Sequence, residues 1–167
     1  LSSDPSSLGP PEAIIVTIGT PVDEFLSPDL KVMGRWLDTA LPHLREGQLI
    51  VLRSTVFPGT TAWLFRRLEA ARKSLDVAYC PERVVQGHAI EEVQQLPQLV
   101  SGITQRAERR AARLFRDVAS SIVTLAPMEA EFAKLFTNAY RYIQFAAANE
   151  FFMIANRAGV DYSKVLG

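Results

Sequence analysis

The sequence predicts an α/β fold built on a doubly wound parallel sheet. Short apolar runs alternate with amphipathic segments of helical period from Ala13 to Ala126, and the runs are apolar throughout, as in strands buried on both faces. Alternation at this spacing favours parallel strands joined by crossover helices. A last segment, from Pro127 to Ala158, contains no turn signal, which predicts one long helix.

The expected strands are short and apolar, and turn residues bound them. The first, AIIVTIG, is β-branched almost throughout, and the second, LIVLRS, ends in a cation and a hydroxyl. DVAYC is shorter, and SIVTL follows a strongly charged segment. In chain order, strands are expected at residues 13–19, 49–54, 76–80, 98–103 and 121–125.

The expected helices carry apolar residues at every third or fourth position. Pro42 strains or ends the first of them, and the basic end of the second suits the helix dipole. Pro127 fits a first helical position and Gly159 is a natural stop, so the last helix is about 45 Å long and needs a second domain or a second subunit beside it. Helices are expected at residues 29–44, 60–73, 104–119 and 127–158, with a brief helical turn at 91–95.

Composition excludes several classes of protein. One cysteine among 167 residues rules out a disulfide framework or a thiolate zinc site, and two histidines leave little for a metal site, so none is expected. Zero net charge argues against a nucleic-acid partner. No apolar run is long enough to span a membrane and no signal peptide opens the chain, so we expect a cytoplasmic protein. Residues 1–12, rich in Ser, Pro and Gly, are expected to be a loop or an added tail.

Candidate site residues follow the first three strands. Ligands of open α/β sheets bind at the carboxyl ends of the strands, where this chain has Thr20-Pro21, the segment Ser54 to Thr61, and Pro81-Glu82-Arg83. The helix N-terminus after Pro58-Gly59 is expected to offer free N–H groups to a phosphate. Each segment alone is more often an ordinary turn or cap, and the combination carries the prediction.

The long helix places Glu131, Lys134 and Asn138 on one face. A solvated polar stripe explains them equally well at this point. The apolar stripe that includes Phe136 and Ile143 is more simply core or interface than a cofactor site.

At these residues the chain resembles the UDP-glucose/GDP-mannose dehydrogenase family, the nucleotide-sugar 6-dehydrogenases. The resemblance runs from Ile14 onward in the family's order and spacing. It is carried by IIVTIGTPVDE, STVFPGTT, YCPERVVQGHAIEEVQQLPQLVSG and EFAKLFTNAYRYIQFAAANEFFMIANRAGVD.

The resemblance implies an NAD-dependent enzyme that oxidises the C6 alcohol of a UDP-sugar to the uronic acid in two hydride transfers, for surface polysaccharide biosynthesis. It implies that residues 13–126 are the later half of a Rossmann-like NAD-binding domain and that residues 127–167 begin a central helical domain, with a homodimer formed through the long helix. PER followed by glycine, with Gln86 where UDP-glucose enzymes often have a second glutamate, is most like the UDP-N-acetyl-D-mannosamine and UDP-N-acetyl-D-glucosamine 6-dehydrogenases.

The resemblance also implies roles for individual residues. Thr20 and Pro21 would bind NAD. Thr55 would do so too and help hold the hydrolytic water, and Glu82 would lie between cofactor and sugar as a base or water-positioning group.

The remaining implied roles concern the substrate. Lys134 would stabilise the developing oxyanion and Asn138 would hydrogen-bond the same oxygen. Arg83 would touch the substrate. These side chains are expected to converge on a single pocket.

Two parts of the family pattern are missing from the sequence. No GxGxxG precedes the strands, and Cys80 does not match the family's nucleophilic cysteine. The chain is therefore expected to be an internal fragment that is inactive alone. A β-hydroxyacid dehydrogenase and a non-catalytic, helix-mediated dimerisation module are the alternatives.

Overall fold

The chain divides into two compact units, residues 1–132 and 133–167. The structure is a computed structural model that describes residues 3–19, 29–83 and 95–167. The first unit contains the sheet and the start of the long helix. The second contains the rest of that helix and a short C-terminal one.

A five-stranded sheet in the order β1-β2-β3-β4-β5 forms the centre of the first unit. β1 pairs in parallel with β2, and β2 pairs in parallel with β3. The paired segments are short and rich in Ile, Leu and Val. This confirms the predicted fold class. The strands are β1 (Ala13–Val16), β2 (Leu49–Leu52), β3 (Asp76–Tyr79), β4 (Gln98–Gly102) and β5 (Ile122–Thr124).

One strand pair differs from the predicted all-parallel arrangement. β4 runs antiparallel to β3, with Tyr79 opposite Ser101, while β5 is again parallel to β4. The chain leaves β3 at its carboxyl end and enters β4 at that same edge, where the Gln98 side chain donates to Pro81 O (3.2 Å). Apolar periodicity identifies a buried strand but not its direction, so the sequence pattern did not distinguish the two arrangements.

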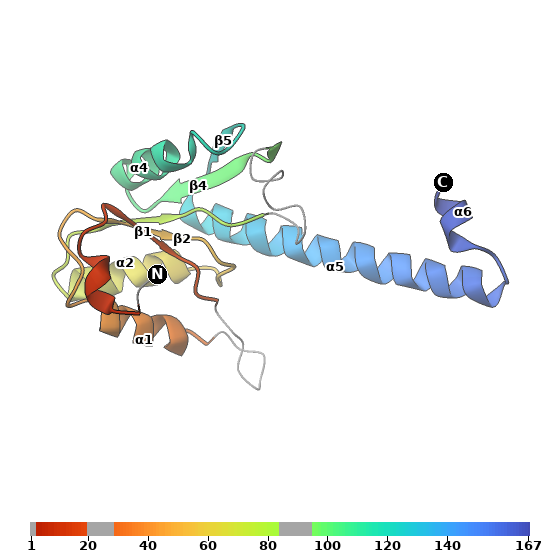
Figure 1. Cartoon of the computed structure of the whole chain (residues 1–167), viewed down its shortest axis with the longest axis horizontal. Helices are drawn as coiled ribbons and strands as arrows, with labels where there is room; N and C mark the ends of the chain where they lie inside the picture. Colours follow the sequence, from red (N-terminus) through yellow and green to blue (C-terminus); the bar gives the residue numbers. More distant parts are fainter. Residues whose placement is uncertain (1–2, 20–28, 84–94) are drawn as a thin grey trace. The chain divides into compact units, whose positions relative to one another are not determined.

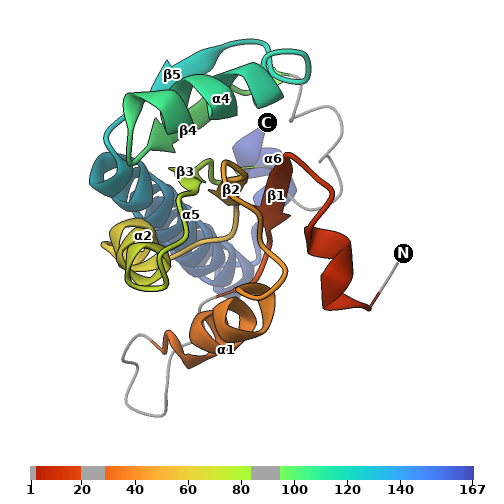
Figure 2. The ribbon, with the colours of Figure 1, turned by 90° about the vertical axis from the view of Figure 1, so that its left-hand side faces the viewer.

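Helices cover both faces of the sheet, as a doubly wound fold requires. Figure 2 shows α1 and α2 on one side of the strands and α4 on the other. Because side chains alternate along a strand, Ile50 packs toward the α1 and α2 core while Val51 packs toward α4. The helices of this unit are α1 (Lys31–Ala40), α2 (Thr60–Ala70) and α4 (Gln105–Phe115).

α1 is shorter than the helix that the apolar spacing predicted over residues 29–44. α1 stops at Ala40, two residues before Pro42, whose missing N–H cannot continue the helical hydrogen bonds, in agreement with the prediction that this proline ends the helix. The helical turn expected at 91–95 falls almost wholly outside the described residues.

The N-terminal segment, expected to be a loop or an added tail, contains a short helix and contacts the sheet. Pro5–Leu8 forms a 3-10 helix (η1) capped by Asp4. The buried Gln48 amide donates to Leu8 O (2.8 Å) and Pro11 O (2.6 Å), which ties the segment to the sheet. This tie joins residues about forty positions apart, so the local composition contained no sign of it.

The long helix α5 (Pro127–Arg157) is continuous, as predicted, and its start belongs to the first unit, where Ala130 is part of the core (Figure 1). Gly159 ends it with φ +70°, and Asp161 caps α6 (Tyr162–Leu166). Much of α5 within the second unit exposes aromatic and aliphatic side chains, among them Tyr142 at 77% and Ile143 at 65%. In the described part of the chain, no helix has both the length and the hydropathy to cross a membrane.

Candidate functional site

The carboxyl ends of the three parallel strands form the candidate site. β1, β2 and β3 end at the same edge of the sheet, and the chain continues there into Gly19, the loop with Thr55, and Glu82. Thr20 and Pro21, expected to bind NAD, lie outside the described residues.

Thr55 lies half-buried in the loop that joins β2 to α2. The next residue, Val56, is buried in the core and anchors the loop from beneath. Gly59 ends the loop with φ +91°, a conformation that favours glycine, and directly precedes α2. The loop is therefore fixed at both ends, and Thr55 is held at the sheet edge.

Glu82 is held at the same edge by an arginine that the sequence analysis did not single out. Arg53 Nη2 donates to Glu82 Oε2 at 2.6 Å, and the arginine side chain is 16% exposed. The Arg53 guanidinium also donates to Cys80 O (3.2 Å) and lies 4.9 Å from the centroid of the Phe115 ring. A lone cation directly after four apolar residues was the available signal for Arg53, since such a side chain needs a partner when the strand is buried.

Arg83 lies half-buried beside this ion pair. Its backbone N–H donates to Glu82 Oε1 (2.6 Å), and its Nη1 donates to Pro97 O (3.4 Å). Its buried Nε has no hydrogen-bond partner among the described residues. Glu82 and Arg83 therefore both lie at the edge of the sheet where the sequence predicted them.

The N-terminus of α2 is closed to a phosphate, which makes that prediction wrong. The buried Glu131 carboxylate accepts from Gly59 N (2.6 Å), Thr61 N (2.8 Å) and Thr61 Oγ1 (2.6 Å). The protein thus supplies its own anion to the positive end of the helix dipole. Glu131 and Gly59 are 72 positions apart, so no local pattern indicated the pairing.

Two side chains at the end of β3 remain protonated near neutral pH. Burial raises the pKa of the Tyr79 hydroxyl strongly, and the neighbouring Glu131 carboxylate adds to the shift. Burial also raises the pKa of Cys80 to about 12. Cys80 is therefore an inert core thiol, in line with its mismatch to a nucleophile.

Lys134 and Asn138 lie one turn apart on α5, in the second unit. Lys134 is buried, at 9% exposure, and Asn138 is half-buried. Glu131, one turn earlier on the same helix face, is 1% exposed. The first two turns of this face are therefore buried and are not a solvated polar stripe. Asn149 and Glu150, further along the helix, are exposed.

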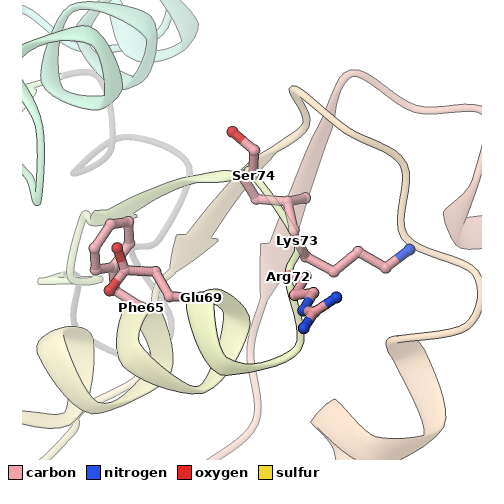
Figure 3. Close-up of a pocket in the computed structure, with 6 residues that line it drawn as sticks. Phe65, Glu69, Arg72, Lys73 and Ser74 are labelled. Atoms are coloured by element: carbon pink, nitrogen blue, oxygen red, sulfur yellow. The ribbon is translucent and has the colours of Figure 1, made fainter.

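A cavity of about 310 Å³ lies at the opposite edge of the sheet, where α2 ends and β3 begins. Figure 3 shows its lining, with Phe65 and Glu69 on α2 and Arg72, Lys73 and Ser74 on the turn that follows. Since this is the amino edge of the parallel strands, the cavity is separate from the candidate site.

Comparison with known proteins identifies the family. Residues 4–119 match the sequence model of the NAD binding domain of the UDP-glucose/GDP-mannose dehydrogenase family. The chain belongs to this family. The match confirms the resemblance and assigns NAD as the cofactor of the matched domain.

Several relatives act on N-acetylated nucleotide sugars by name. UDP-N-acetyl-D-mannosamine dehydrogenase of Methanocaldococcus jannaschii is 30% identical over 154 residues, covering 90% of this chain and 36% of that protein. NDP-N-acetyl-D-galactosaminuronic acid dehydrogenase of Ralstonia solanacearum is 33% identical over 165 residues, covering 91% of this chain and 39% of that protein. The chain thus spans somewhat more than a third of the length of these relatives.

Solved structures show the same fold. UDP-D-ManNAc dehydrogenase from Pyrococcus horikoshii matches with a TM-score of 0.86 and 28% identity, over 98% of this chain and 40% of that one. GDP-mannose dehydrogenase from Pseudomonas aeruginosa matches in fold with a TM-score of 0.85 at 22% identity.

The residue types at the sheet edge are suited to hydrogen-bonding the ribose groups of a dinucleotide. Thr55 offers a hydroxyl and Glu82 a carboxylate, groups that hydrogen-bond ribose hydroxyls and amides. The phosphates must be held by groups other than the N-terminus of α2, because Glu131 occupies it.

Proposed function

We propose that this chain is part of an NAD-dependent nucleotide-sugar 6-dehydrogenase. The enzyme would oxidise the C6 alcohol of a UDP-N-acetylhexosamine to the uronic acid in two hydride transfers. The observation that carries the proposal is the position of the Thr55 loop and Glu82 at one sheet edge, in a chain about one-third identical to UDP-N-acetyl-D-mannosamine dehydrogenases over most of its length.

The residues at the sheet edge would bind and orient the reactants. NAD, when bound, would supply the hydride acceptor for this oxidation. Thr55 would hydrogen-bond the cofactor and the water used in hydrolysis, and Glu82, as an anionic acceptor, would orient that water or the substrate hydroxyl. Arg83 would contact the substrate.

Lys134 and Asn138 would stabilise the substrate oxygen that becomes negatively charged during the reaction. An ammonium group removed from bulk water stabilises an oxyanion far better than one in water, and Lys134 is buried. Asn138, one turn further along the helix, would donate a hydrogen bond to the same oxygen.

The isolated 167-residue chain would not complete the reaction. Its single cysteine is buried and has its pKa raised to about 12, so it supplies no thiolate for a covalent intermediate. The catalytic test therefore needs the full-length polypeptide in which these residues occur.

Exposed apolar residues on α5 favour a homodimer formed through this helix. The second unit exposes Phe136 at 66% and Ile143 at 65%, more apolar surface than a solvated helix carries. Sedimentation of the chain should show a dimer that Ile143→Glu weakens at least about tenfold, since a buried charge at an interface costs more than about 1.4 kcal/mol. Glu69→Gln, at an exposed residue of α2 rather than of α5, should leave the dimer intact. A monomeric wild-type chain would contradict the dimer.

Stoichiometry and substrate choice test the enzyme activity. The full-length protein should form two NADH per UDP-N-acetylhexosamine and act poorly on UDP-glucose, and Lys134→Ala should abolish the activity. One NADH per sugar, or a preference for a 3-hydroxyacid, would refute the proposal and favour the β-hydroxyacid dehydrogenase alternative. A dimer that binds no NAD and oxidises nothing would favour the dimerisation module.

A further inference from the structure

The Arg53 guanidinium connects three neighbouring strands at the candidate site. Arg53 follows β2, and its Nη1 donates both to Cys80 O, just after β3 (3.2 Å), and to Gln98 Oε1 at the start of β4 (3.1 Å). Its Nη2 donates to Glu82 Oε2 (2.6 Å). The antiparallel direction of β4 makes this possible, because it brings the first residue of β4 to the carboxyl edge of β3.

The other contacts of this cluster restrict the arginine further. Phe115, at the end of α4, lies against the guanidinium at 4.9 Å from the ring centroid, within cation–π distance. Gln98, itself buried, donates to Pro81 O (3.2 Å) and Leu99 O (2.7 Å), which orients its oxygen toward Arg53. The guanidinium therefore has a fixed position before any ligand binds.

Glu82 is attached to Arg53 twice. Its backbone N–H donates to Arg53 O (2.9 Å), which continues the β2–β3 pairing past the strands, and its carboxylate accepts from Arg53 Nη2. The second carboxylate oxygen accepts from Arg83 N (2.6 Å). With both oxygens bonded, the carboxylate plane has a defined orientation even though the side chain is 37% exposed.

We propose that Arg53 is a positioning residue for the dehydrogenase reaction, and that it acts by holding the Glu82 carboxylate in its reactive orientation. The inference rests on the proposed function, in which Glu82 orients water or substrate. A misplacement of about 1 Å can cost about 100-fold in rate, so a residue that fixes the carboxylate matters without touching the reactants.

The forked shape of the guanidinium is essential to this role. Arginine can bond Glu82, Cys80 O and Gln98 together from one planar group, whereas the single ammonium of lysine cannot span the same three acceptors. Arg53→Lys therefore keeps the charge and removes the positioning.

A double-mutant cycle in the full-length protein tests the inference. Arg53→Met and Glu82→Gln should each lower kcat about 10- to 100-fold, and the double variant should be no slower than Glu82→Gln alone, because Arg53 acts only through that carboxylate. Arg53→Lys should lower kcat about tenfold or more with little change in melting temperature. Arg67→Met, which removes an exposed ion pair to Asp38, should leave kcat unchanged.

The outcomes separate this inference from the proposed function. A wild-type protein that reduces no NAD with any nucleotide sugar overturns the proposed function and this inference with it. An active wild type in which the two losses multiply, or in which Arg53→Lys is fully active, leaves the function standing and overturns the positioning role. If Arg53→Met fails to fold, the same cycle with Arg53→Lys decides.

Discussion

Removing the Glu131 carboxylate should destabilise the first unit more than any surface substitution. Three donors bond to this buried group, namely Gly59 N, Thr61 N and Thr61 Oγ1. Leaving a buried donor without an acceptor costs about 1–3 kcal/mol each, and breaking a buried charged contact costs about 3–5 kcal/mol in all. Because the threonine hydroxyl can rotate and water can enter the space, we expect Glu131→Ala to cost about 3 kcal/mol.

The isosteric variant should lose less. In Glu131→Gln the amide oxygen can still accept from both Thr61 donors, but the amide NH2 then faces the N–H of Gly59, donor against donor. The loss is one hydrogen bond to a charged group, about 2 kcal/mol. The predicted order of stability is wild type, then Gln, then Ala.

Urea and thermal unfolding of the chain, followed by tryptophan fluorescence, measure these losses. Both tryptophans, Trp36 and Trp63, lie in the first unit, so the signal reports on that unit. For a chain of this size 1 kcal/mol corresponds to about 2–4 °C, so Glu131→Ala should melt about 6–12 °C lower. Glu150→Ala on the exposed part of the same helix should change little. Equal midpoints for the two alanine variants would refute the reasoning.

Three further predictions concern other parts of the first unit. Asp76→Asn should cost about 1–3 kcal/mol in urea unfolding, because this buried carboxylate bonds two arginines of α4, whereas Asp38→Asn, in an exposed pair, should cost less than about 1 kcal/mol. Gly59→Ala should lower stability by about 1–2 kcal/mol because of its φ of +91°, while Gly34→Ala inside α1, with free space around it, should raise it by up to about 1 kcal/mol. Cys80 should resist iodoacetamide at pH 8 until the chain unfolds, and because its pKa rises from 9.0 to about 12 on folding, stability should fall as pH rises through that interval. Rapid alkylation of the native chain, or similar effects within either matched pair, would contradict these expectations.

The sequence alone determined the strands of the sheet, the longer helices and the faces they bury, although not the short helices η1 and α6. Runs such as LIVL identify strands buried on both faces, and the spacing of apolar residues identifies the buried face of each helix. This works because side chains repeat about every two residues along a strand and every 3.6 residues along a helix. Pro42 and Gly159 marked helix ends for equally local reasons, one lacking an N–H and the other tolerating positive φ. The position of Thr55 and Glu82 at one sheet edge followed from strand order and the rule for parallel sheets.

Only the tertiary structure decided which polar groups bond to each other. The Glu131 carboxylate on the N-terminus of α2 and the Arg53 guanidinium across three strands join residues between 27 and 72 positions apart, and the antiparallel direction of β4 likewise depends on pairing between separate segments. Hydrogen bonds of this kind depend on distance and angle within a few tenths of an ångström, and no periodic pattern along the chain encodes such geometry. Apolar burial is non-directional and can be inferred from composition and spacing, whereas polar pairing is directional and is settled only when the folded backbone brings donor and acceptor together.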